Sequence, residues 1–166
     1  MRKVAFILEP CRVRKVMLYE SSEGVYVFCY DCIQDFSSIS DHLHNTIEDA
    51  EDFCMETYNI QFDNWISISD PLQGCQHDFI LPTKVKEKEN GKPEWIHFQS
   101  LINNRWVDIG TSDHTQSFDA MTVNERLFIS GLMDEFDASK IGDKTKAKQI
   151  LRSLQVDEPS IALIIK

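Results

Sequence analysis

The sequence predicts an α+β fold: a mainly antiparallel sheet of about five to seven strands, one central helix, and a helical C-terminal module. Three observations predict it. Apolar, β-rich runs separated by turn residues fill residues 1–110, one amphipathic helical pattern interrupts them after the first three runs, and helical periodicity with capping residues fills residues 122–166. Strands followed by a run of helices are typical of this class. We therefore expect a sheet domain at 1–110 and a helical module at 122–166.

The composition narrows the class of protein. The chain has 166 residues, 42% of them apolar, which is enough for one domain with a sizeable core. Its formal net charge is −10. Nucleic acid and anionic membranes repel such a surface, so we expect neither as a partner, whereas a cationic protein would be attracted. No sequence motif indicates a cofactor.

The N-terminus and the cysteines indicate the compartment. Only five apolar residues precede Glu9 and Pro10, too few for a secretory leader, and no apolar run approaches membrane-spanning length. The five cysteines are an odd number spread over half of the chain, which favours reduced thiols over a disulfide framework. We expect a cytoplasmic protein of undetermined oligomeric state.

The first three strands are predicted by short β-rich runs. Val4–Leu8 is one strand. Val13–Tyr19 and Val25–Ile33 are two more, and the turn that ends at Gly24 should join them as an antiparallel hairpin. Ser37–Asn45 is polar and predicts no regular structure.

A helix is predicted from Thr46 to Tyr58. Thr46 is a suitable N-cap, with Asp49 three residues on, and acids in the first turn suit the positive end of the helix dipole. One face of the helix is apolar or weakly polar: Ile47, Ala50, Phe53, Cys54, Thr57 and Tyr58. The other face is acidic: Glu48, Asp49, Glu51, Asp52 and Glu56.

Strand character returns at Asn64–Ile68. Turn-forming residues then predict a loop over Asp70–Asp78. Phe79–Lys86 should be extended, and Pro82 makes it an edge or bulged strand.

A second hairpin is predicted after a solvated turn at Lys86–Pro93. Glu94–Ile102 and Arg105–Ile109 should pair around Asn103 and Asn104, since asparagine tolerates the left-handed conformation that tight turns need. The two-residue loop sets Leu101 opposite Trp106 and Phe98 opposite Ile109. The face with Ile96, Phe98, Val107 and Ile109 is assigned to the core, and that with Trp95, His97, Leu101 and Trp106 to the second side.

The remainder is predicted to be helical. Gly110–Met121 is a polar linker, and Thr122 with Glu125 forms a capping box that opens a helix to about Lys140. Gly142 closes that helix, Asp143 caps a second, and Asp157 with Pro159 starts a short third. The stripe on the first helix comprises Phe128, Ile129, Leu132, Met133 and Phe136.

Two groups of residues have the composition of a chemical site. Cys29 and Cys32 have the spacing of redox and zinc pairs, and His42 with His44 could complete a zinc site if that segment were extended, although packed core thiols are the simpler interpretation. Cys75, His77 and Asp78 could form a nucleophilic loop, although no oxyanion-hole pattern accompanies them and ordinary loop contacts explain the same residues.

The acidic bias is the strongest functional signal. From Asp35 to Asp78 the sequence has ten Asp or Glu and no Lys or Arg. A plain solvated face is one interpretation, and a docking surface for a basic protein is the other. The candidate partner-binding residues are Glu48, Asp49, Glu51, Asp52, Glu56, Asp70 and Asp78.

Two segments resemble proteins of bacterial polymorphic toxin loci. The first is Asn64–Ile80, which reads NWISISDPLQGCQHDFI and follows the acidic helix; the second is Val123–Asp137, which reads VNERLFISGLMDEFD, with Leu151–Ile165 after it. The resemblance implies an immunity protein, a cytoplasmic inhibitor that binds one cognate toxin. Neither segment corresponds to an active site, so the resemblance supplies no catalytic residue.

Together these observations predict neutralisation of a basic, nuclease-type toxin by stoichiometric binding, with no enzymatic activity. Two alternatives stay open. One is a small cytoplasmic enzyme that uses Cys75, His77 and Asp78, and the other is a scaffold protein that recruits a partner through Phe128, Leu132 and Phe136 of the helical tail.

Overall fold

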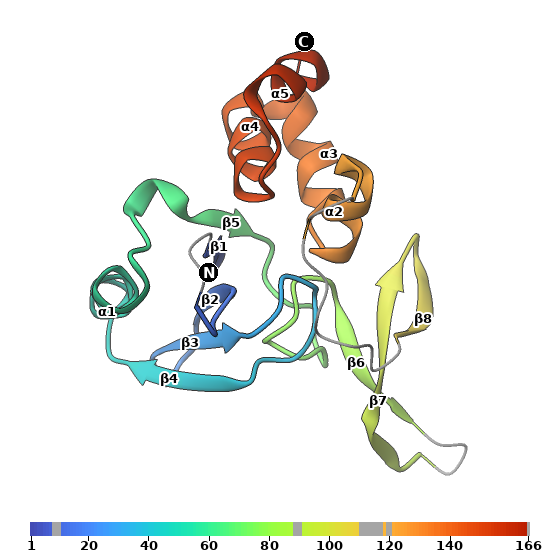
Figure 1. The fold of residues 1–166 in the computed structure, drawn as a ribbon. Coiled ribbons are helices and arrows are strands. Elements are labelled where there is room, and N and C mark those ends of the chain that lie inside the picture. The colour runs from blue at the N-terminus through green and yellow to red at the C-terminus, as the bar shows by residue number, and fades with distance from the viewer. Residues whose placement is uncertain (8–10, 88–90, 110–117, 119–120, 166) are drawn as a thin grey trace.

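Two antiparallel sheets contain the strands of the described part of this chain (Figure 1). The computed structural model describes residues 1–7, 11–87, 91–109, 118 and 121–165. The larger sheet has the strand order β4-β3-β2-β1-β5 and the smaller β6-β7-β8, so the predicted strands divide between two sheets. The strands are β1 Arg2–Phe6, β2 Lys15–Glu20, β3 Val25–Tyr30, β4 Ser40–His44, β5 Ile66–Ile68, β6 Thr83–Glu87, β7 Pro93–Ile102 and β8 Arg105–Ile109.

One helix follows the first four strands and the other α-helices follow the last strand, which confirms the predicted α+β class. Figure 1 shows α1 on one side of the larger sheet and α2–α5 gathered in one group, with α4 beside β5. The helices are α1 Ile47–Tyr58, α2 Val123–Ile129, α3 Met133–Gly142, α4 Lys144–Ser153 and α5 Glu158–Ile164, with a 3-10 turn, η1, at Phe62–Asn64.

The larger sheet is covered on both faces because its strands are apolar on both. On one face Val16, Leu18 and Val27 pack against Ala50 and Cys54 of α1. The alternate residues point the other way, as the period of a strand requires. On that face Val4, Met17 and Ile66 belong to one buried cluster with side chains of the C-terminal helices, among them Leu127, Leu132, Ile150, Leu151 and Ile161. The helical module therefore packs on the sheet, a point that the sequence left open.

Several helix starts, turns and strand pairings occur where local sequence signals predicted them. Thr46 Oγ1 accepts a hydrogen bond from the Asp49 backbone N–H at 3.1 Å and so caps α1. Asn103 and Asn104 both have positive φ, 50° and 59°, in the hairpin turn. That turn sets Leu101 opposite Trp106 as predicted. The predicted hairpin of β2 and β3 is confirmed, and so is the edge position of β6, although this strand begins at Thr83, after Pro82, and not at Phe79.

Three predictions about the fold are wrong. Ser40–His44, expected to be irregular, is strand β4, because it pairs with β3 along its whole length. The helix expected from Thr122 to Lys140 is broken into α2 and α3, since Gly131 has a φ of 74°. The third concerns the second hairpin: Val107, assigned to the core, is 43% exposed on the edge strand β8, whereas its partner Ser100 on the central strand β7 is buried.

The predicted linker at Gly110–Met121 falls mostly outside the described residues. Of that segment the structure describes only Phe118, which is buried in the core cluster that includes the C-terminal helices, and Met121, which packs against it. The division into 1–110 and 122–166 therefore stays a prediction.

Candidate functional site

The outer side of α1, which carries most of the acidic side chains of this helix, is exposed along its length. Ala50 and Cys54 turn inward and are buried, and Phe53 and Tyr58 are half-buried beside them. The helix period then places the acids outward. Four of the five are exposed: Glu48, Asp49, Asp52 and Glu56.

Glu51 differs from the other acids of α1. Its carboxylate forms an ion pair with the Lys3 ammonium group of β1, and both side chains are largely buried. The same ammonium group lies 5.4 Å from the centre of the Trp65 ring. Glu51 therefore fixes α1 to the sheet, although the sequence placed it among the partner-binding residues.

The four exposed acids form an unneutralised row. Within the part of the chain that the structure describes, no Lys or Arg pairs with Glu48, Asp49, Asp52 or Glu56. Like charges one helical turn apart, as in Glu48 with Asp52 and Asp52 with Glu56, destabilise a helix slightly, so the helix dipole, which favours acids only in the first turn, does not explain the whole row. We name this row of four carboxylates the acidic face.

Two apolar side chains adjoin the acidic face in the sequence. Met55 lies on the outer side of α1 and is 46% exposed, and Phe62, in the turn η1 that follows the helix, is 80% exposed. Gln149 of α4 donates hydrogen bonds to the backbone oxygens of Asp63 and Trp65, at 2.6 Å and 2.9 Å. These bonds hold η1 in place, so the exposed Phe62 ring projects from a fixed backbone.

The structure does not bring Asp70 and Asp78 to the acidic face. Asp70 is exposed and lies 3.3 Å from the N-terminal amino group. The Asp78 carboxylate accepts a hydrogen bond from the Ser38 backbone N–H at 2.9 Å, and its backbone oxygen accepts one from the Tyr30 hydroxyl at 2.6 Å. Tyr30 points to the sheet face opposite α1, so this loop covers the other side of the sheet.

The nucleophilic loop does not assemble a nucleophile and a base. Cys75 is buried, the His77 ring packs on Tyr19 with centroids 4.6 Å apart, and Asp78 is engaged with Ser38. Among the described residues no hydrogen bond joins any two of Cys75, His77 and Asp78. The three side chains therefore have separate surroundings in the loop and are not linked to one another by hydrogen bonds.

Buried charges that the sequence analysis missed hold this loop against the sheet. The guanidinium group of Arg2 donates to the backbone oxygens of Ser69 and Phe79. The Asp35 carboxylate accepts from the backbone N–H groups of Ile80 and Leu81, at 2.7 Å and 2.8 Å. The available signal was the position of Lys15 within the apolar strand run Val13–Tyr19; Arg2 precedes the predicted strand Val4–Leu8 and gave no such signal.

Burial shifts the ionisation of these groups. Lys15 is fully buried, its ammonium group donates to the backbone oxygen of Gln34 at 2.6 Å, and desolvation lowers the pKa of Lys15. Desolvation likewise raises the pKa of Asp35, although the charges of Lys15 and Arg2 oppose that rise. The opposite charges compensate one another, which indicates a structural role for them.

The predicted cysteine pair is also buried. Cys29 lies 3.4 Å from the Tyr58 hydroxyl, and desolvation raises the pKa of both Cys29 and Cys32. His42 and His44 are extended, yet their rings pack on Phe53, with centroids 5.0 Å apart in each case. Among the described residues no three His, Cys, Asp or Glu side chains gather closely enough to hold a metal ion.

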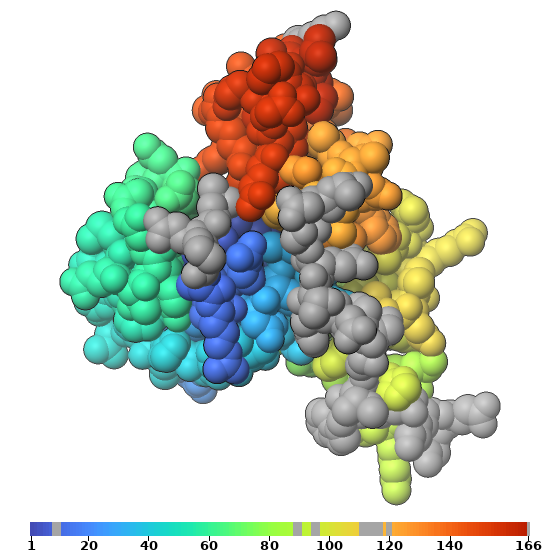
Figure 2. All heavy atoms as spheres, in the orientation of Figure 1, coloured from blue at the N-terminus to red at the C-terminus, as the bar shows by residue number. Residues whose placement is uncertain are grey.

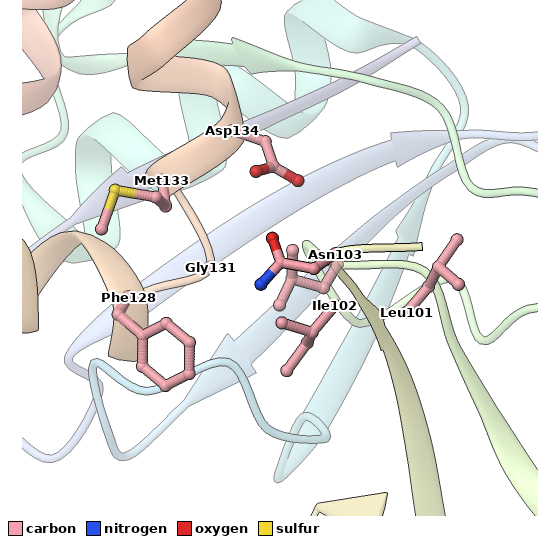
Figure 3. Close-up of a pocket in the computed structure, with 8 residues that line it drawn as sticks. Leu101, Ile102, Asn103, Phe128, Gly131, Met133 and Asp134 are labelled. Atoms are coloured by element: carbon pink, nitrogen blue, oxygen red, sulfur yellow. The ribbon is translucent and has the colours of Figure 1, made fainter. Parts of the chain in front are cut away.

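A cavity of about 240 Å³ lies between the second hairpin and the helices (Figure 3). Leu101, Ile102 and Asn103 line it from the hairpin, and Phe128, Met133 and Asp134 line it from α2 and α3. Of the residues in the scaffold hypothesis, only Phe128 is accessible, at 55% exposed, because Leu132 and Phe136 are buried in the core. The broken helix therefore presents no continuous apolar stripe to a partner.

None of the described helices combines the length and the apolar character that a membrane-spanning segment needs. Comparison of the chain with protein-family models, curated proteins and solved structures found no match.

Proposed function

We propose that this chain is an immunity protein that acts in the cytoplasm and neutralises one cognate protein toxin by stoichiometric binding. The acidic face of α1 is its main contact surface. The observation that carries the proposal is the unneutralised row of Glu48, Asp49, Asp52 and Glu56 on a helix anchored to the sheet. The sequence resemblance to polymorphic toxin loci supplies the class of partner.

The charge of the acidic face suits a toxin that acts on nucleic acid. Such enzymes need basic clefts, because phosphates must be neutralised when the substrate binds. A helix with exposed carboxylates can enter such a cleft in place of the phosphates and exclude the substrate. Long-range attraction would raise the association rate more than it would raise the final affinity.

The apolar side chains beside the acids add a source of affinity. Buried aromatic anchors surrounded by polar residues contribute most of the binding energy at many interfaces. Phe62 and Met55 are exposed next to the acidic face in the sequence and would lose water on contact with a partner. An exposed acidic helix kept only for solubility would need neither of them.

Co-expression with the product of the adjacent upstream gene tests the proposal. We expect that product to be toxic alone, to lose its toxicity when this chain is present, and to co-purify with it at one-to-one stoichiometry. Unrelieved toxicity, together with failure to co-purify, would overturn the proposal. A chain with Phe62→Ser should protect less well than one with Leu163→Ser, which changes a comparably exposed apolar residue on α5.

A further inference from the structure

The larger sheet ends at an open strand. β4 pairs with β3 on one side only, and within the described residues no strand pairs with its outer edge. In Figure 1 β4 forms the lower rim of the sheet with no ribbon beyond it, and Figure 2 shows residues of its colour at the lower surface of the molecule. Four of its five residues are exposed. Its outer backbone groups are therefore available to another strand.

Two acidic side chains of α1 lie on the side of this helix that is nearest to the edge strand. The Phe53 ring contacts His42 and His44 of β4, so this side of α1 lies over the edge strand. Asp49 and Glu56 stand one turn before and one turn after Phe53, on the same side of the helix. Glu51 faces the opposite side, where it meets Lys3. Asp49 and Glu56 are thus on the side of α1 nearest to the edge where a strand would be added beside β4.

The other face of the edge combines an apolar patch with the exposed Asp41, which lies on the same face as Leu43. Leu43 is 53% exposed and lies opposite Tyr26 of β3. The Tyr26 ring stacks on Phe28, with centroids 5.7 Å apart and an angle of 6° between the rings. Successive side chains of an added strand point to opposite faces, so alternate residues would meet the acids of α1 and this apolar patch.

From this geometry we propose that the free edge of β4 is a strand-addition site for an extended basic segment of the toxin. Cationic side chains of that segment face Asp49 and Glu56, and apolar ones face Leu43 and Tyr26. Backbone hydrogen bonds provide the affinity, and the two faces provide the selectivity. This inference rests on the proposed function for the identity of the partner.

Electrostatic repulsion disfavours a second copy of this chain as the strand that pairs with β4. An antiparallel pair of β4 strands related by a two-fold axis keeps the same sheet face on the same side. Both α1 helices would then lie on one face across the seam, with Asp49 and Glu56 of one copy near those of the other. The like charges of the two copies would repel one another, whereas a basic strand is attracted to these acids.

The full chain can be tested with a fluorescein-labelled peptide of alternating lysine and valine. Its control is the same peptide methylated on every backbone nitrogen, which keeps the charge but cannot donate hydrogen bonds. We expect the unmethylated peptide to bind about tenfold more tightly and to slow deuterium exchange of amides in residues 40–44. Equal binding of the two peptides, absence of binding, or unchanged exchange in β4 would overturn the inference.

A matched pair of variants tests the role of α1. Asp49→Lys and Glu48→Lys make the same change of charge at adjacent exposed positions in the first turn, but only Asp49 lies on the side of β4. We expect Asp49→Lys to weaken peptide binding about fivefold and Glu48→Lys to weaken it by less than about twofold. Equal effects would mean that general attraction, and not the edge, holds the peptide.

The two proposals fail separately. If the toxin co-purifies with the chain but leaves exchange in β4 unchanged, the strand-addition site is refuted and the immunity function stands. If the peptide protects β4 but no upstream product co-purifies, the edge site is supported and the immunity function is refuted.

Discussion

The carboxylate of Asp35 lies against Gly131. A Cβ atom at Gly131 would stand 2.9 Å from Asp35 Oδ2, and the backbone N–H of Asp35 donates to Ile129 O at 2.8 Å. The same carboxylate accepts two hydrogen bonds from the segment before β6. Asp35 therefore connects the end of the first strands, the loop before the second sheet and the break between α2 and α3.

Replacement of Gly131 by alanine should destabilise the fold by about 1–3 kcal/mol, because a side chain is strained at its φ of 74° and also meets Asp35. Gly74→Ala is the control, since Gly74 has a φ of 81° but nothing within 4 Å of an added Cβ. Urea unfolding of both variants measures the difference. A cost for Gly131→Ala no larger than that for Gly74→Ala would show that the Asp35 contact is unimportant.

Lys15→Met should cost about 3 kcal/mol near neutral pH, because it removes a buried cation and, of the two positive charges that act on Asp35, the one with the larger effect. The cost should shrink in acid. Burial already raises the pKa of Asp35, and loss of Lys15, whose charge opposes that rise, would raise it further.

The sign of the pH dependence follows from proton binding. Between the ordinary carboxyl pKa and the raised pKa of Asp35, the folded state binds more protons than the unfolded state, so the free energy of unfolding falls as the pH rises. This window is wider in Lys15→Met. Unfolding between about pH 4 and pH 7 should show a growing deficit against the parent chain. Asp35→Asn in the Lys15→Met background should remove that trend, and a deficit independent of pH would contradict the account.

Local signals predicted much of this fold, and long-range contacts account for what they missed. The capping residues Thr46 and Thr122 and the pair Asn103–Asn104 act within a few residues, so they predicted helix starts and a hairpin register correctly. Strand β4 has no alternating apolar pattern, and only its pairing with β3 makes it extended. The break at Gly131 was missed because a single glycine is tolerated in a helical pattern; here Asp35, remote in the sequence, occupies the space beside it.

The residues of the candidate site were also predictable only in part, because local signals identified the acids of α1 and long-range contacts were missed. The acids of α1 were assigned to one face by helix period alone, and four of them are exposed there. Glu51 was grouped with them because its partner, Lys3, is far away in the sequence. The same distance concealed the backbone acceptors of Arg2, which made it look like an ordinary charge at the N-terminus.

A single thiol should react rapidly with a disulfide reagent in the folded chain. Cys11 is exposed, whereas Cys29, Cys32, Cys54 and Cys75 are buried, and desolvation raises the pKa of Cys54 to about 12. Cys11→Ser should therefore abolish the fast phase. Peptide mapping that located the fast label at Cys75 would contradict this prediction and would favour the enzymatic alternative.

Charge reversal on α1 should slow association with the toxin. Asp52→Lys combined with Glu56→Lys should reduce the association rate about tenfold at low salt, because steering depends on the field of the acidic face. The fold should be retained, since both side chains are exposed. Circular dichroism and stopped-flow mixing measure the two quantities.

Asp134→Lys with Asp137→Lys is the matched control, because it makes the same change of net charge at exposed positions on α3. It should reduce the rate much less than the changes on α1. Equal reductions by the two pairs would mean that total charge, and not the acidic face, steers the partner.

The most direct test of the central claim is a calorimetric titration of the purified chain with the purified product of the adjacent upstream gene, at low and high salt. The account predicts a tight one-to-one complex that weakens as salt rises, because exposed charges are screened. Absence of binding, or a tight complex whose affinity and association rate are independent of salt, would contradict inhibition through the acidic face.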